Sequence, residues 1–159
     1  MFAKPFKLML VNVILLSSVA FAEPAVRLEQ WRRAIAIEQG LLSISQKNIE
    51  FKKAGEKEYS YEKMRLEVFA LLSSEVDPNV LASIAHSSLF LIGEGSIDDD
   101  IFNNVKMDAS FDISIARIEE IGTHEAFDTL ERFRGTEKLQ GSQIILVEET
   151  IRRLKTKLK

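Results

Sequence analysis

Apolar residues recur three, four or seven positions apart along every long segment of this 159-residue chain. That spacing places side chains on one face of an α-helix, whereas a half-buried strand alternates apolar and polar residues. The sequence contains no alternating stretch of useful length. Proline and glycine are scarce while aliphatic residues, Glu, Lys and Ala are plentiful, which also favours helix. We therefore predict an all-α fold.

The helix boundaries are marked by local signals. Asp77-Pro78 predicts a helix start, because the carboxylate can cap free amides and proline suits the first turn. Residues 52–58 predict a loop, and Thr123 predicts another cap. Gly93, Gly122 and Gly135 predict helix ends, and Gly40 predicts a bend or end in the first helix. A short helix is expected from Ser96 to about Val105. The expected apolar stripes are Leu28-Trp31-Ile35-Leu42-Ile49, Tyr61-Met64-Val68-Leu71-Leu72, Leu81-Ile84-Ala85-Leu89-Ile92, Phe111-Ile115-Ile118-Ile121, Ala126-Phe127-Leu130-Phe133 and Ile144-Val147-Ile151-Leu154-Leu158.

Two segments match when the chain is shifted by 29 residues. The matched positions are Ile84 and Ile113, Leu89 and Ile118, Ile92 and Ile121, Gly93 and Gly122, and Ile101 and Leu130. The stretch from Ile118 to Leu130 resembles the turn of a HEAT-type helical repeat, with an aliphatic-Gly stop, a polar turn and apolar positions on a second helix. The resemblance covers residues 77–135 and implies an α-α superhelix, a short helical-repeat solenoid, whose shorter helices line a binding face. An irregular helical bundle is the alternative that the same stripes allow.

The N-terminus reads as a secretory signal peptide. Lys4 and Lys7 precede an apolar run over residues 8–19, and Ala20-Phe21-Ala22 offers small residues at the positions that a signal peptidase grips. We expect cleavage after Ala22 and a periplasmic or secreted protein. An uncleaved membrane anchor is the alternative, although a spanning helix needs about 20 apolar residues.

Cleavage would leave a single domain over residues 23–159, which is 137 residues long and contains no cysteine. Its 19 basic and 24 acidic residues give a net charge of −5. This balance argues against nucleic acid as a partner and against attraction to anionic lipid, so no membrane contact is expected after cleavage. A domain of this length can bury a core without disulfides or metal.

No motif specifies a reaction, so we expect no enzyme activity, no cofactor and no metal. His124-Glu125 lacks the second histidine that a zinc-protease helix requires. Asp98-Asp99-Asp100 lacks the alternating ligands of a calcium loop and fits the first turn of a helix. His86 is expected to be a partly buried structural residue, since the sequence places no titratable group beside it. The basic end of the last helix, residues 152–159, suits a helix C-terminus.

These observations lead to two hypotheses. The first is a non-enzymatic protein-interaction module, for example an immunity or adaptor protein, whose partner is another protein. Its candidate partner-binding residues are polar and lie off the apolar stripes: Asp99, Asp100, Asn103, Asn104, Glu125, Asp128 and Arg132. The second is a small-molecule or lipid-binding helical domain or weak hydrolase, with a pocket between helices. Its only candidates for polar contacts or chemistry in that pocket are His86, Ser87, Ser88 and Glu94.

Overall fold

A computed structural model describes residues 24–53, 61–93 and 101–159 of the chain. These residues form helices and no strand, which confirms the all-α prediction. The predicted signal peptide, most of the predicted loop at 52–58 and the aspartates at 98–100 lie outside the described residues. The helices are α2 (Pro24–Lys53), α3 (Tyr61–Ser73), α4 (Pro78–Gly93), α5 (Ile101–Ile121), α6 (His124–Thr136) and α7 (Ser142–Lys157).

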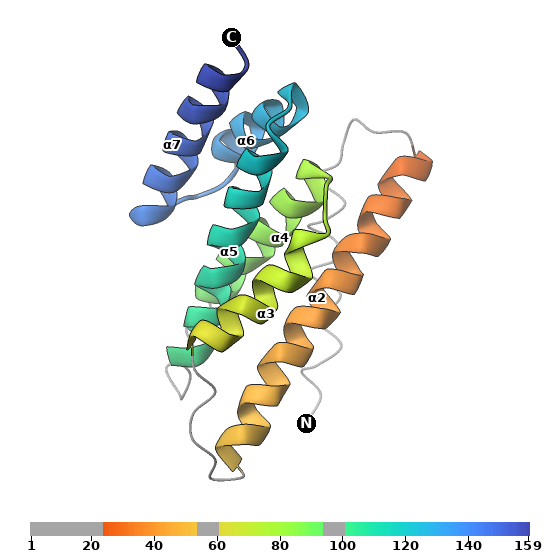
Figure 1. Cartoon of the computed structure of the whole chain (residues 1–159), viewed down its shortest axis with the longest axis vertical. Coiled ribbons are helices and arrows are strands. Elements are labelled where there is room, and N and C mark those ends of the chain that lie inside the picture. The colour runs from red at the N-terminus through yellow and green to blue at the C-terminus, as the bar shows by residue number, and fades with distance from the viewer. Residues whose placement is uncertain (1–23, 54–60, 94–100) are drawn as a thin grey trace.

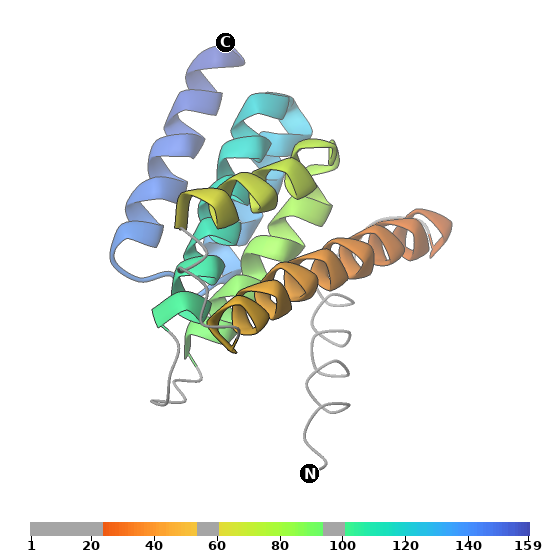
Figure 2. The same ribbon diagram turned by 60° about the horizontal axis from the view of Figure 1, so that its bottom comes forward.

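Extensive contacts join each helix to helices one or two places along the chain. The pairs are α2–α3, α2–α4, α3–α5, α4–α5, α4–α6, α5–α6, α5–α7 and α6–α7, and the α4–α5 contact is the largest. In both ribbon views α2 and α7 lie on opposite sides of the molecule (Figures 1 and 2). The core is accordingly centred on α4 and α5, where Leu81, Ile84, Phe111, Ile115 and Ile118 are buried.

Helix α5 differs from the prediction. The expected short helix ending near Val105 and the expected stripe beginning at Phe111 belong to one continuous helix, Ile101–Ile121. The intervening residues 106–110 contain no glycine or proline, so nothing in them ends a helix. The predicted short helix of the first matched segment and the predicted long helix of the second are therefore one helix, α5. The two segments do not each form a separate pair of one long and one short helix.

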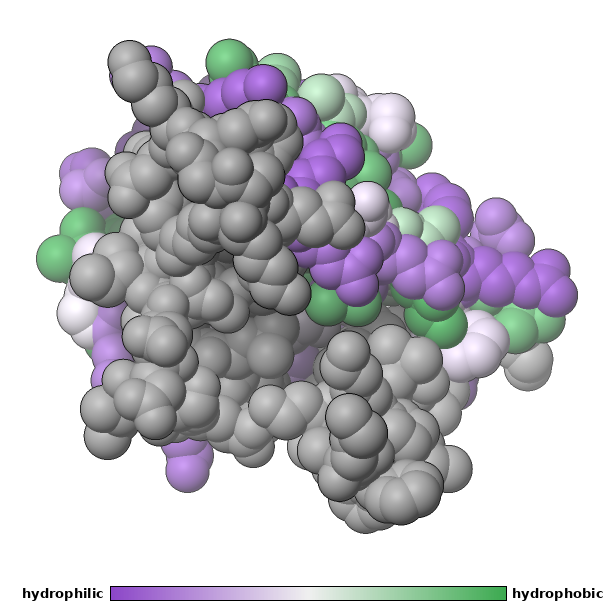
Figure 3. Space-filling model, turned by 90° about the horizontal axis from the view of Figure 1, so that it is seen from below, coloured by the Kyte–Doolittle hydropathy of each residue, from purple (hydrophilic) through white to green (hydrophobic). Residues whose placement is uncertain are grey.

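The face that α2 buries also differs from the predicted stripe. Leu28 and Leu42 are 46% and 45% exposed, and the buried positions are Gln30, Ala34, Ile37, Leu41 and Ile44. Helix α2 has apolar residues on more than one side, and packing against α3 and α4 selects the side that is buried. Seen from below, part of the described surface projects from the molecule as a hydrophilic ridge, and hydrophobic patches lie along this ridge (Figure 3).

At Gly40 the sequence predicted a bend or end of the first helix, and at Gly135 it predicted the end of a later one. Helix α2 runs through Gly40, and α6 runs through Gly135 to Thr136. A Cβ at Gly40 would lie 2.8 and 2.9 Å from the two terminal carbons of Leu71, so the missing side chain allows α2 and α3 to approach closely. Gly122 does end α5, with a φ of 65° that glycine adopts without strain.

Candidate functional site

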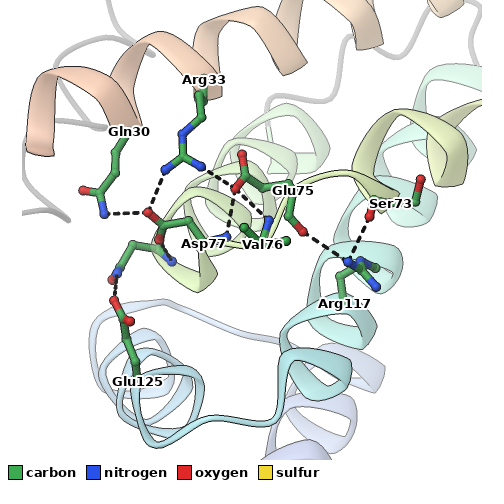
Figure 4. A network of polar contacts seen from close by, with 9 residues as sticks. Gln30, Arg33, Ser73, Glu75, Val76, Asp77, Arg117 and Glu125 are labelled. Atoms are coloured by element: carbon green, nitrogen blue, oxygen red, sulfur yellow. Dashed lines mark hydrogen bonds and ion pairs between the residues drawn. The ribbon is translucent and has the colours of Figure 1, made fainter.

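The turn between α3 and α4 is held by a buried carboxylate. Glu75 is only 5% exposed, and its Oε1 accepts hydrogen bonds from the backbone amides of Val76 and Asp77, both at 2.8 Å. The same oxygen lies 2.9 Å from Nη1 of Arg33 on α2 (Figure 4). A single side chain therefore fixes two consecutive amides of the turn and links it to α2.

Asp77 continues this network at the start of α4. Its Oδ1 accepts a 2.9 Å hydrogen bond from the amide of Asn79, which is the helix cap predicted from Asp77-Pro78. Its Oδ2 accepts from Gln30 Nε2 and from Arg33 Nη2, each at 2.9 Å. Arg33 thus bridges two carboxylates with its two terminal nitrogens, a geometry that the planar guanidinium suits well.

The opposite side of the turn is fixed from α5. Nη2 of Arg117 donates to the carbonyl oxygens of Ser73 at 2.9 Å and of Glu75 at 3.2 Å (Figure 4). Nη1 of Arg117 pairs with Glu120. The backbone of residues 73–77 is therefore held from α2 and α5 together. We call residues 74–77 the braced turn.

The braced turn is followed by a polar contact with α6. Asn79 Nδ2 donates to Oε1 of Glu125 at 3.0 Å. Asn79 Oδ1 accepts from Nη2 of Arg132 at 2.9 Å and from Oγ1 of Thr129 at 3.2 Å. Two of the predicted binding residues, Glu125 and Arg132, therefore contact α4 through one asparagine.

Large apolar side chains are exposed in the braced turn and on α3, the helix that precedes it. Val76 within the turn and Leu66 on α3 are both 67% exposed, and Phe69 on α3 is 47% exposed. Leu66 and Phe69 are three positions apart and so share one side of their helix. We use the name α3 apolar face for Leu66 and Phe69 on α3 together with Val76 in the turn that follows this helix.

The structure does not bring all the predicted binding residues together. Asn103 and Asn104 lie in the first turn of α5, and Glu125 lies in the first turn of α6, beyond the other end of α5. At 1.5 Å per residue, the helix between them is roughly 25 Å long. Asp128 is exposed on α6, while Asp99 and Asp100 lie outside the described residues.

His86 has a neighbour that the sequence pattern did not indicate. Its Nδ1 lies 2.6 Å from Oε2 of Glu137, and both side chains are 15% exposed. Glu137 directly follows α6, 51 positions along the chain, so no local spacing could have revealed the pair. The hydroxyls of Ser87 and Ser88 donate to Ser83 and Ile84 carbonyls one turn back, and Glu94 lies outside the described residues.

Another charged pair joins α5 to α7. Arg153 Nε and Nη2 lie 2.8 and 2.9 Å from the two carboxylate oxygens of Glu119. This hydrogen bonding to Glu119 raises the pKa of Arg153, which keeps the guanidinium charged. Arg153 is exposed and Glu119 is only partly exposed, and the pair helps to orient α7 against α5.

The described part of the chain contains no group of three or more His, Asp or Glu side chains arranged to hold a metal ion. Among the same residues, no helix is both long and apolar enough to span a membrane. The carboxylates of the braced turn are engaged by backbone amides and guanidinium groups, an arrangement suited to fixing a backbone. No protein-family model, curated protein or solved structure matches the chain.

Proposed function

We propose that this protein is an exported, non-enzymatic protein-interaction module. The proposed architecture is a short α-α superhelix of the HEAT-like kind in which α4, α5 and α6 stack in order, with α5 belonging to both matched segments, and the helices on either side extend it. The contacts between helices one or two places apart support this, since stacked repeat proteins bury their cores between near neighbours.

The observation that carries the proposal is the exposure of the α3 apolar face, above all of Val76 within the braced turn. Val76 is 67% exposed although the backbone on both sides of it is fixed by Glu75, Arg33 and Arg117. A surface already held in one conformation loses little conformational entropy when a partner binds. An exposed apolar side chain on a backbone already held in this way can pack against a partner with little further ordering.

The proposed location is the periplasm or the extracellular space, reached through the predicted signal peptide with cleavage after Ala22. The partner would be another protein, as for an immunity or adaptor protein. The acidic balance of residues 23–159 supports a protein partner over nucleic acid.

A site-specific crosslinker tests the binding surface in the producing cell. We would place a photoreactive amino acid at Val76, and as a control at Glu148, an exposed position on α7. A discrete adduct from position 76 that is absent from position 148 is expected. Equal adducts from both positions, or none from position 76, would contradict the proposed surface.

A second experiment uses the purified adduct partner. Phe69→Asp and Val76→Asp should each weaken its binding at least tenfold, since both place a charge in an apolar contact. The helix content of both variants should match that of the wild type by circular dichroism, because neither side chain is buried.

A further inference from the structure

Helix α2 carries a second row of apolar side chains that the described part of the chain leaves uncovered. Leu28 and Leu42 are 46% and 45% exposed, and Ile35 between them is partly exposed. All three belong to the stripe predicted from the sequence, and none of them packs against the core. We call these three residues the outer row of α2. We propose that the outer row is the contact between two copies of this chain, whose α2 helices pack against each other antiparallel.

The outer row points away from the helices that α2 contacts. The side chains that α2 buries against the core are those of Ala34, Ile37, Leu41 and Ile44. At 3.6 residues per turn, the outer row lies roughly 140° around the helix from this buried row. Helix α2 contacts α3 and α4, and one end of it projects beyond the other helices (Figure 2). A second helix can therefore reach the outer row without displacing α3 or α4.

The spacing of the outer row indicates that its partner is a helix. Leu28, Ile35 and Leu42 are seven positions apart, the repeat that keeps one seam facing a second helix when two helices wind around each other. The residues that alternate with them on the same side are polar and exposed: Arg32, Gln39 and Gln46. A lipid surface would instead favour a wide apolar face without a seven-residue period.

A second copy of this chain fits the row because the row is self-complementary. A twofold axis at Ile35 places Leu28 of one copy against Leu42 of the other and brings the two Ile35 side chains together. The same axis places Arg32 beside the neutral Gln39 of the second copy. Apolar side chains thus meet apolar ones, and no like charges face each other. The contact involves no residue of the α3 apolar face and does not depend on the proposed function.

Charge decides between the antiparallel and the parallel arrangement. In a parallel pair, flanking residues five positions apart face each other across the seam, and their charges set the orientation. Arg27 and Arg32 are five positions apart, so a parallel pair would bring two positive charges together on each side of the seam. The antiparallel pair avoids this repulsion.

The size of the contact sets its expected strength. From Leu28 to Gln46 the helix is roughly 27 Å long. Packing two such faces together buries on the order of 1,000 Å² in total, which lies at the lower end for a specific interface. We therefore expect a reversible dimer with a Kd of roughly 1–100 μM.

Sedimentation velocity of the protein purified from the producing cell tests the dimer. Ile35→Asp and Leu42→Asp should each weaken association at least about tenfold, since each places a charge in the apolar seam. Ala36→Asp is the matched control, because Ala36 is exposed on α2 but lies about 100° around the helix from Ile35. This control should dimerise like the wild type. A wild type that stays monomeric up to about 500 μM, or equal weakening in all three variants, would overturn the proposal.

Cysteine crosslinking tests the arrangement with milder substitutions, since the chain contains no cysteine of its own. Under mild oxidation Ile35→Cys should form a disulfide-linked dimer and Ala36→Cys should not, because a disulfide requires Cβ atoms about 4 Å apart. Leu28→Cys and Leu42→Cys should crosslink when the two proteins are mixed, and neither should crosslink alone. A disulfide dimer of Leu28→Cys alone would overturn the antiparallel arrangement, and the absence of one from Ile35→Cys would overturn the contact.

Discussion

At the scale of single residues, Ser114 on α5 is fully buried, and its Oγ has no hydrogen-bond partner in the structure. Burying a hydroxyl without a partner costs about 1–3 kcal/mol. We expect Ser114→Ala to raise the free energy of unfolding by about 1 kcal/mol, since alanine fills nearly the same space without the polar atom. Urea denaturation measures this change.

Ser88 on α4 is the matched control. It is equally buried, but its hydroxyl donates to the carbonyl of Ile84 at 2.9 Å. Ser88→Ala should therefore leave stability unchanged or lower it. A gain in Ser88→Ala equal to that in Ser114→Ala would show that the missing partner is not the cause.

Glu75 is the residue on which the braced turn depends. Glu75→Gln removes the charge that faces Arg33 and leaves a weaker acceptor for the amides of Val76 and Asp77. We expect the free energy of unfolding to fall by about 2 kcal/mol, since Arg33 is left with an incompletely compensated charge at a partly buried site. Glu62→Gln, at an exposed position in the first turn of α3, should change it by less than about 0.5 kcal/mol.

At the scale of helices, α2 and α3 approach each other at Gly40. Alanine favours helix by about 1 kcal/mol over glycine, but its Cβ would meet Leu71 at 2.8 Å. Gly40→Ala should therefore change the free energy of unfolding by less than about 0.5 kcal/mol in the wild type, because displacing the end of the Leu71 side chain offsets the helix gain. In a Leu71→Ala background the same change should raise it by about 1 kcal/mol, since nothing then opposes the helix gain. An equal effect in both backgrounds would exclude crowding by Leu71.

The helices that were predicted correctly depend on local signals. The caps by Asp77 and Thr123 and the stop at Gly122 need only residues a few positions apart, and the structure contains all three. The continuity of α5 was missed because the apolar stripe weakens between Val105 and Phe111 although no helix-breaking residue is present. The buried side of α2 was missed because packing partners, and not its own pattern, select it.

The site contacts were less predictable for a related reason. Arg33 and Glu75, Arg117 and Ser73, and His86 and Glu137 are more than 40 positions apart, and no sequence spacing encodes such distances. Only the Asp77 cap, which is local, was expected. Exposure of Val76 likewise depends on how α3 and α4 meet, which a helical stripe does not specify.

At the scale of the whole molecule, α2 and α7 share no extensive contact within the described residues. Core changes in the two helices should therefore act independently. We expect Ile37→Ala in α2 and Leu154→Ala in α7 to lower the free energy of unfolding by about 2–4 kcal/mol each, and the double variant to equal their sum within about 0.5 kcal/mol. Chemical denaturation of the four proteins measures the difference. A departure above about 1 kcal/mol would indicate coupling across the molecule.

In the braced turn, the backbone conformation does not depend on which side chain is present at position 76. Glu75 and Asp77 hold the chain through amides and arginines, while the side chain between them points into solvent. Any residue except proline, which lacks the amide that Glu75 binds, could then occupy this position without altering the scaffold. Position 76 is thus a place where a new side chain could be introduced while the framework around it is kept.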